Sequence, residues 1–201
     1  MKVIELNKEY DFSCAMANID FDISISEEII DKKDLYFGEE NEDKRTYGLE
    51  DNPHVTILYG LHNDIKESDV TDILKLFKDI KIKLINASLF ENEKFDVLKF
   101  DVESEELFTM NKIFTEMFEY TTDYPDYHPH VTIAYLKKGT AKKYVDKFDE
   151  LINVEGLSEI RIKEYTYSSN KKKYIIDVNS DNDNDDEEEI DESVVLKWDE
   201  F

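Results

Sequence analysis

Cysteine, glycine and proline are scarce in this chain, and each shortage excludes a class of site. Cys14 is the single cysteine among 201 residues, so neither an internal disulfide nor a cysteine-based zinc site can form. With 5 glycines and 3 prolines, the sequence contains no GxGxxG and no Walker-type run, which excludes a Gly-rich phosphate loop. The near absence of cysteine agrees with a reducing compartment, and we expect a cytoplasmic protein.

Long apolar runs and positive charge are also missing. No stretch reaches the about 18 consecutive apolar residues of a transmembrane helix, and the start MKVIELNKEYD turns acidic too early for a signal peptide. Lys and Arg number 25 against 49 Asp and Glu, which gives a formal net charge of −24. Because proteins hold long nucleic acids through many cationic phosphate contacts, we expect neither stable binding of a long nucleic acid nor a membrane partner. A small phosphorylated ligand needs only a few local groups and stays compatible with this charge.

The residues that are abundant suit one sizeable core. Hydrophobic residues make up 40% of the chain and include 12 Tyr and 12 Phe. Alternating and amphipathic patterns predict strands at 12–22, 54–60, 81–90, 95–104, 130–137, 157–169 and 172–179, and helices at 66–80, 104–120 and 139–152.

The order of these elements indicates an internal duplication. Strands 54–60 and 130–137 are each followed by a helix and then by a hairpin, with turns at LFENEKF and SSNKKKY. We therefore expect an α+β fold of two pseudo-symmetric lobes, with mainly antiparallel sheets, helices on the outside and a central cleft. The domain should span 1–179, followed by a disordered acidic linker at 180–192 and a tail at 193–201, either a peptide or an edge strand.

One short motif occurs at the head of both strands. Residues 52–60 read NPHVTILYG and residues 128–136 read HPHVTIAYL, so both contain P-H-V-T-I-x-Y. Because side chains alternate along a strand, each His shares a face with the Thr two places later. The same alternation puts Tyr59 and Tyr135 out of register with the histidines, and we expect them to pack behind the strands. His62 is expected in a surface loop.

Paired in one site, two such motifs suit phosphodiester cleavage without a metal. A His with a pKa near 6.5 can act as acid or base at neutral pH, and two in opposite protonation states can do both. Threonine hydroxyls and nearby amides can donate hydrogen bonds to phosphate oxygens. Either His could be the base. His128 and His130 could also be read as part of a metal site, but the motifs lack the usual carboxylate or cysteine partners, so we expect no metal and no cofactor.

The doubled H-x-T pattern resembles the two-histidine (2H) phosphoesterase superfamily over about residues 10–179. That superfamily includes RNA 2′,5′-ligase-like proteins, cyclic phosphodiesterases and phage proteins that destroy cyclic-oligonucleotide defence signals. The resemblance implies that His54 and His130 are the catalytic pair and that Thr56 and Thr132 complete the catalytic site by binding phosphate. YGLEDNPHVTILYGLH resembles segments of the phage proteins, which favours the anti-CBASS branch and, for a viral protein, the host cytoplasm.

Two more residues are candidates for substrate binding. Lys138 has the same strand parity as His130 and could reach a phosphate, although it also lies in a lysine cluster typical of a solvated helix start. Tyr127 lies just before the second motif.

The leading hypothesis is a phosphodiesterase that cleaves ribonucleotide 3′–5′ or 2′,3′-cyclic linkages, best of all in cyclic-oligonucleotide immune signals. The alternatives are an RNA end-processing enzyme of the 2′,3′-cyclic phosphodiesterase or 2′,5′-ligase type, and a non-catalytic nucleotide-binding protein.

Overall fold

The computed structural model describes residues 12–38, 47–124, 126–154, 158–169 and 173–178. Along the chain the elements are β1 (Phe12–Ile19), α1 (Ser24–Ile29), η1 (Lys32–Asp34), β2 (His54–His62), α2 (Glu67–Leu74), β3 (Lys81–Glu91), β4 (Phe95–Glu103), α3 (Glu105–Met117), β5 (His130–Lys137), α4 (Lys142–Val154), β6 (Glu159–Ser168) and β7 (Lys173–Asp177). The predicted acidic linker 180–192 and the tail 193–201 lie outside the described residues. No described helix is long and apolar enough to cross a membrane.

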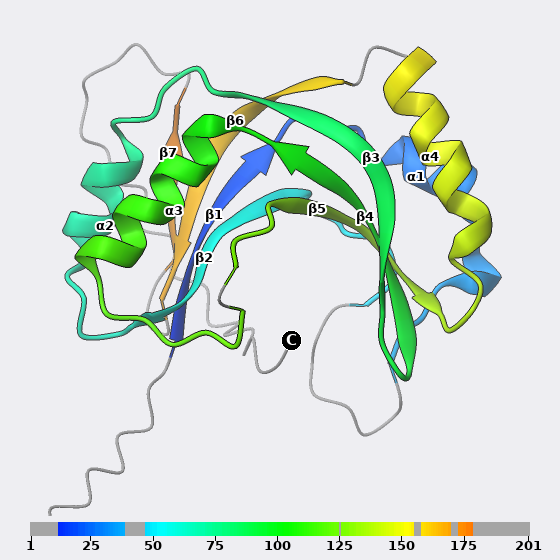
Figure 1. The fold of residues 1–201 in the computed structure, drawn as a ribbon, viewed down its shortest axis with the longest axis horizontal. Helices are drawn as coiled ribbons and strands as arrows, with labels where there is room; N and C mark the ends of the chain where they lie inside the picture. Colours follow the sequence, from blue (N-terminus) through cyan, green and yellow to red (C-terminus); the bar gives the residue numbers. More distant parts are fainter. Residues whose placement is uncertain (1–11, 39–46, 125, 155–157, 170–172, 179–201) are drawn as a thin grey trace, which may run out of the picture.

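The strands form one antiparallel seven-stranded sheet in the order β1-β2-β5-β4-β3-β6-β7. The beginning of β6 pairs with β3, at Arg161 opposite Lys81, and the rest of β6 pairs with β1, at Tyr165 opposite Ala17. The sheet is therefore curled, because β6 pairs both with β3 and with β1 at the far end of the order. Figure 1 shows the result as an arch, with α2 and α3 outside one leg and α1 and α4 outside the other. The predicted α+β class, the antiparallel hairpins β3–β4 and β6–β7 and the outer helices are confirmed.

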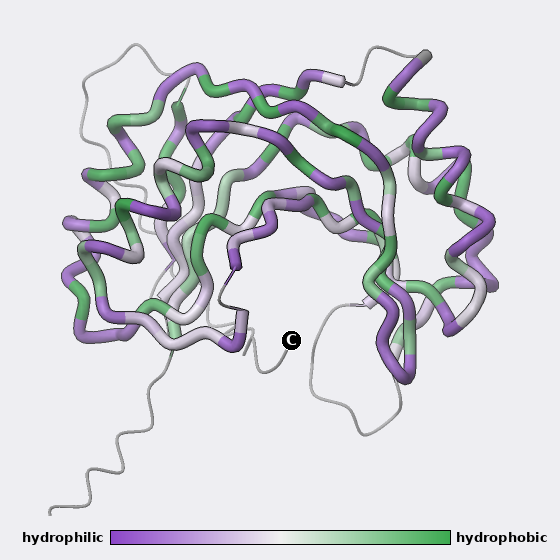
Figure 2. The backbone as a smooth tube through the Cα atoms, viewed as in Figure 1, coloured by the Kyte–Doolittle hydropathy of each residue, from purple (hydrophilic) through white to green (hydrophobic). Residues whose placement is uncertain are grey.

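The two longest helices cover the sheet with one apolar face each. In α3 the Ser104 hydroxyl accepts a hydrogen bond from the amide of Leu107 at 3.2 Å, which caps the first turn. Leu107, Met110 and Phe114 then recur at helical spacing, are fully buried, and face β2. Helix α4 covers β3 in the same way, and in Figure 2 polar and apolar stretches alternate along both helices. The core thus lies between these helices and one face of the sheet.

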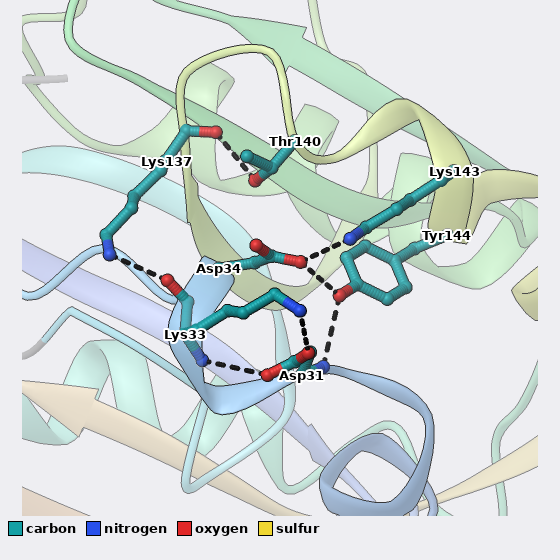
Figure 3. A network of polar contacts seen from close by, with 7 residues as sticks. All are labelled: Asp31, Lys33, Asp34, Lys137, Thr140, Lys143 and Tyr144. Atoms are coloured by element: carbon teal, nitrogen blue, oxygen red, sulfur yellow. Dashed lines mark hydrogen bonds and ion pairs between the residues drawn. The ribbon is translucent and has the colours of Figure 1, made fainter.

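A polar network fastens the end of β5 to α4 and η1 (Figure 3). The buried Asp34 carboxylate accepts a hydrogen bond from the Tyr144 hydroxyl at 2.6 Å and pairs with the Lys143 ammonium at 2.5 Å. The Lys137 ammonium donates to the backbone carbonyl of Lys33 at 2.6 Å. Hydrogen bonds from Lys143 and Tyr144 hold the pKa of Asp34 below its ordinary value, so this carboxylate is charged in the native fold.

Candidate active site

The two repeated motifs meet where β2 and β5 pair. Val55 lies directly opposite Val131, and both side chains are buried beneath the helices. In an antiparallel ladder the flanking residues then face each other, so His54 lies opposite Thr132 and Thr56 opposite His130. All four side chains are half-buried on the other side of the sheet, which we call the histidine face. His54 and His130 are thus diagonal neighbours. Such residues lie about 7–8 Å apart, close enough for one phosphodiester to contact both imidazoles.

Both imidazoles are held in the same orientation by a backbone carbonyl two residues earlier. The Nδ1 atom of His54 lies 2.8 Å from the carbonyl oxygen of Asn52, and that of His130 lies 2.9 Å from the carbonyl oxygen of His128. Because a carbonyl oxygen only accepts, each Nδ1 must carry the hydrogen. The Nε2 atom of each ring is then the nitrogen that can take up or release a proton.

A matching β-bulge follows the threonine of each motif. Thr56 and Leu58 oppose the consecutive residues Met16 and Ala15, so Ile57 is the extra residue in β2. In β5 the extra residue is Ile133, because Thr132 and Ala134 oppose consecutive residues of β4. The bulges reverse the alternation beyond them.

The prediction that the motif tyrosines turn away from the histidine face is therefore wrong. Tyr59 opposes Cys14, and Tyr135 opposes Val97, which places both on the histidine face. Tyr135 is buried there, with its ring 5.4 Å from that of Tyr47 and 5.8 Å from that of Phe95.

A buried lysine that sequence reasoning missed lies beside the second motif. Lys99 of β4 directly opposes Thr132, and its neighbour on the same face, Asp101, opposes His130. The Lys99 side chain is 7% exposed, and its ammonium lies 2.7 Å from the Ser88 hydroxyl and in contact with the Asp101 carboxylate. Lysine is rarely buried unless its charge is paired, and Asp101 is the partner of Lys99. The signal in the sequence was the alternation of Lys99 and Asp101 with the apolar residues Leu98, Phe100 and Val102 of the same strand.

Phe90 connects this lysine to the second histidine. The Lys99 ammonium lies 4.4 Å from the centre of the Phe90 ring, and the same ring meets the His130 imidazole edge-on at 5.0 Å. Burial lowers the pKa of His130, the positive charges of Lys99 and His54 lower it further, and the bond to the carbonyl of His128 and the charge of Asp101 oppose them. His130 is therefore neutral over more of the physiological pH range than an ordinary histidine.

Asp101 is the counterion of this group. Burial raises the pKa of Asp101, but hydrogen bonds from Lys99, Ser88 and Asn86 together with the charge of Lys99 outweigh that effect and lower it. The amide of Asn86 donates to the second carboxylate oxygen at 2.8 Å. The pair is thus ionised and is held by bonds from the neighbouring strand β3.

The first motif has different neighbours at the equivalent positions. Met16 opposes Thr56, and Asn18 opposes His54, where the other lobe has Lys99 and Asp101. The Asn18 amide donates at 2.8 Å to both Glu164 and Thr166 of β6. The backbone is duplicated, whereas the charges next to the histidines are not.

A carboxylate lies near His54 instead. Glu50 accepts a hydrogen bond at 3.2 Å from the amide of Asn52, the residue whose carbonyl holds His54. Burial raises the pKa of Glu50, and the charge of His54 opposes that rise.

The remaining candidates, Tyr127 and Lys138, bond to other residues than the histidines. The Tyr127 hydroxyl donates at 3.1 Å to the carbonyl of Thr56, so it anchors the loop before β5 to β2, and burial raises its pKa. The Lys138 ammonium pairs at 2.8 Å with buried Asp96, beyond the other end of β5 and about 25 Å of strand from His130. The structure does not bring Lys138 to the histidines, and its binding of substrate stays a prediction.

His62 is not in a surface loop. It ends β2, is 7% exposed, and its Nε2 lies 2.9 Å from the Thr121 hydroxyl. Among the described residues no three His, Cys, Asp or Glu side chains gather as a metal site would require.

Comparison with known families decides the relationship. The family model described as "Anti-CBASS protein Acb1" matches residues 49–172, a span that contains both motifs and Lys99. The chain belongs to the Acb1 family of anti-CBASS proteins. The predicted place in the anti-CBASS branch of the 2H phosphoesterase superfamily is thereby confirmed.

Solved structures share the fold of this Acb1-family chain. Usb1 of Kluyveromyces marxianus with uridine monophosphate superposes with a TM-score of 0.53 at 11% identity, over 84% of this chain and 98% of that chain. A second structure of the same Usb1 gives a TM-score of 0.52 at 10% identity, over the same shares of the two chains. Comparison with curated proteins found no match.

Proposed function

We propose that this protein is a metal-independent phosphodiesterase that uses its two H-x-T motifs to open cyclic oligonucleotides. The observation that carries the proposal is the pair of imidazoles on adjacent strands, each with Nδ1 bonded to a carbonyl and Nε2 left for proton transfer. Membership of an anti-CBASS family supports a cyclic-oligonucleotide signal as the substrate.

The reaction follows from what these groups can do. One imidazole takes the proton of a ribose 2′-hydroxyl, whose oxygen attacks the adjacent phosphorus. The other imidazole gives a proton to the departing 5′-oxygen, which leaves a 2′,3′-cyclic phosphate and a free 5′-hydroxyl. Thr56 and Thr132, each opposite the histidine of the other motif, donate hydrogen bonds to the non-bridging phosphate oxygens.

The charge of the chain favours a small substrate. At −24, the protein repels a long polyanion along its whole length, whereas a cyclic di- or trinucleotide brings only a few charges to one site. The Usb1 structure with uridine monophosphate illustrates a nucleotide bound to this fold, in that protein.

Incubation with a panel of substrates in EDTA tests the proposal. Cyclic di- and trinucleotides, 2′,3′-cyclic mononucleotides and single-stranded RNA are compared at physiological salt, and the products are separated by chromatography. We expect a cyclic oligonucleotide to be opened fastest. Turnover of RNA ends or 2′,3′-cyclic mononucleotides alone would point to an RNA end-processing enzyme, and tight binding without turnover would point to a nucleotide-binding protein.

A further inference from the structure

The two histidines have equivalent backbones but unlike charged neighbours, and this difference assigns their roles. We infer that Lys99, paired with Asp101, positions His130 as the general base, and that His54, beside Glu50, is the general acid. The inference rests on the proposed function, because it concerns the direction of proton transfer within that site.

Lys99 is placed to act on His130 rather than only to stabilise the sheet. It is buried on the histidine face directly opposite Thr132, and Phe90 contacts both its ammonium and the His130 ring. An ion pair that served only the fold would be expected at the equivalent position of the other lobe. Met16 stands there and is equally buried, so this part of the sheet packs well without a cation.

The charged groups around His130 come from two neighbouring strands. β4 contributes Lys99 and Asp101, and β2 contributes His54, while the adjacent side chain of β3 is the uncharged Phe90. The Asp101 carboxylate is already bonded by Lys99 and by Asn86. The Lys99 ammonium is therefore the cation that disfavours a second positive charge on His130, and a neutral imidazole is the form that a base requires.

The groups around His54 have the opposite character. Glu50 is joined to it through Asn52, and Asn18, opposite His54, is bonded to Glu164. The Glu50 carboxylate attracts a positive charge on His54, and an imidazolium is the form that a general acid requires.

The proton balance then closes in one step. The Nε2 of His130 takes the 2′-hydroxyl proton while the 2′-oxygen forms its bond to phosphorus. The bond from phosphorus to the 5′-oxygen breaks, its electron pair stays on that oxygen, and His54 supplies the proton. The protein ends with His130 protonated and His54 neutral, and exchange with water restores the starting forms.

Leaving-group replacement tests which histidine is the acid. A cyclic trinucleotide and a linear dinucleotide are compared with analogues that carry sulfur in place of the 5′-bridging oxygen, because a thiolate leaves without a proton. His54→Ala should lose about 10²–10⁴-fold on the oxygen substrates yet come within about tenfold of the wild type on the sulfur analogues. His130→Ala should lose activity on both. Rescue of His130→Ala but not of His54→Ala by sulfur would overturn the assignment.

Titration of the histidines by NMR tests the part played by Lys99 without relying on turnover. In Lys99→Met the His130 titration should move to higher pH, and the acidic limb of the kcat/KM profile should move with it, whereas Lys99→Arg should restore both. Lys83→Met is the matched control, because it removes an exposed lysine that lies 3.7 Å from Glu103. An unmoved His130 titration in folded Lys99→Met would make Lys99 structural only. If the wild type cleaved none of the substrates, the proposed function would be wrong. The NMR titration would still decide whether Lys99 acts on His130.

Discussion

The backbone carbonyl of Pro53 accepts a hydrogen bond from the amide of Ile19 at 3.0 Å. Its counterpart in the second repeat, Pro129, accepts one from Val102 at the same distance. Each H-x-T strand thus enters the sheet through a proline, which favours an extended backbone at the preceding residue and itself donates no hydrogen bond. The two histidines that follow are consequently presented in the same way.

Loss of either imidazole should nearly abolish turnover. His54→Ala and His130→Ala should each slow the cleavage of a cyclic trinucleotide by about two to four orders of magnitude, the usual effect of losing a general acid or base. Because both act in one transfer, the double variant should be little slower than the slower single variant. His128→Ala is the control, because the His128 side chain is exposed and the bond to His130 comes from the backbone carbonyl. Wild-type rates in both single variants would exclude the two-histidine mechanism.

The threonine hydroxyls should matter for rate more than for folding. Thr56→Val and Thr132→Val keep the shape of the side chain but remove the donor, so turnover should fall by about ten- to a thousandfold, as with other lost oxyanion donors. Melting temperature is measured in parallel, with Thr109→Val on the exposed side of α3 as the control. A large drop in melting temperature with an unchanged rate per folded molecule would show that these threonines are structural.

The acidic limb of the activity profile should lie below the ordinary titration range of histidine. The pKa of His130 is lowered chiefly by burial, with Lys99 and His54 adding to the effect. A base with a lowered pKa stays neutral as pH falls past about 6.5, and turnover is lost only when the pH passes the lowered value. Rates measured from acid to alkaline pH in EDTA should give a bell. Activity that disappeared in EDTA and returned with zinc or manganese would favour the His128–His130 metal site.

The network around Asp34 should contribute stability and not turnover. Hydrogen bonds from Lys143 and Tyr144 lower the pKa of Asp34, so its stabilising effect is fully present above the unfolded value of about 3.9 and is lost as pH falls through the folded value. Asp34→Asn should therefore lower the melting temperature at neutral pH, and the difference from the wild type should shrink below about pH 4. Asp31→Asn is a milder control, because the Asp31–Lys33 pair is more exposed. An equal difference at every pH would show that the charge of Asp34 is not the cause.

Local patterns predicted the elements well, because each strand and long helix carries its own hydrophobic period. All seven strands and the helices α2, α3 and α4 lie within the expected ranges or close to them. The short α1 and η1 were missed, since helices of 6 and 3 residues are too short for a hydrophobic period to be detected. That both motifs belong to one site was expected from the repeat itself.

What the sequence could not give depends on contacts between strands. The bulges at Ile57 and Ile133 turn Tyr59 and Tyr135 onto the histidine face, and a bulge is defined by the register of the partner strand. Lys99 was missed for the same reason, because its place opposite Thr132 exists only once β4 and β5 pair. Lys138 has the same strand parity as His130 but lies beyond the far end of β5, paired with Asp96.

The most direct test of the account follows the mass and linkage of the product of a cyclic trinucleotide. Attack by the neighbouring 2′-hydroxyl opens the ring without adding water, so the first product should be linear, end in a 2′,3′-cyclic phosphate and have the mass of the substrate. The analogue that lacks the 2′-hydroxyl at every linkage should resist, in EDTA, at enzyme concentrations that consume the ribonucleotide completely. Equal cleavage of the deoxy analogue, or a first product that already contains the added water, would contradict attack by the neighbouring 2′-hydroxyl.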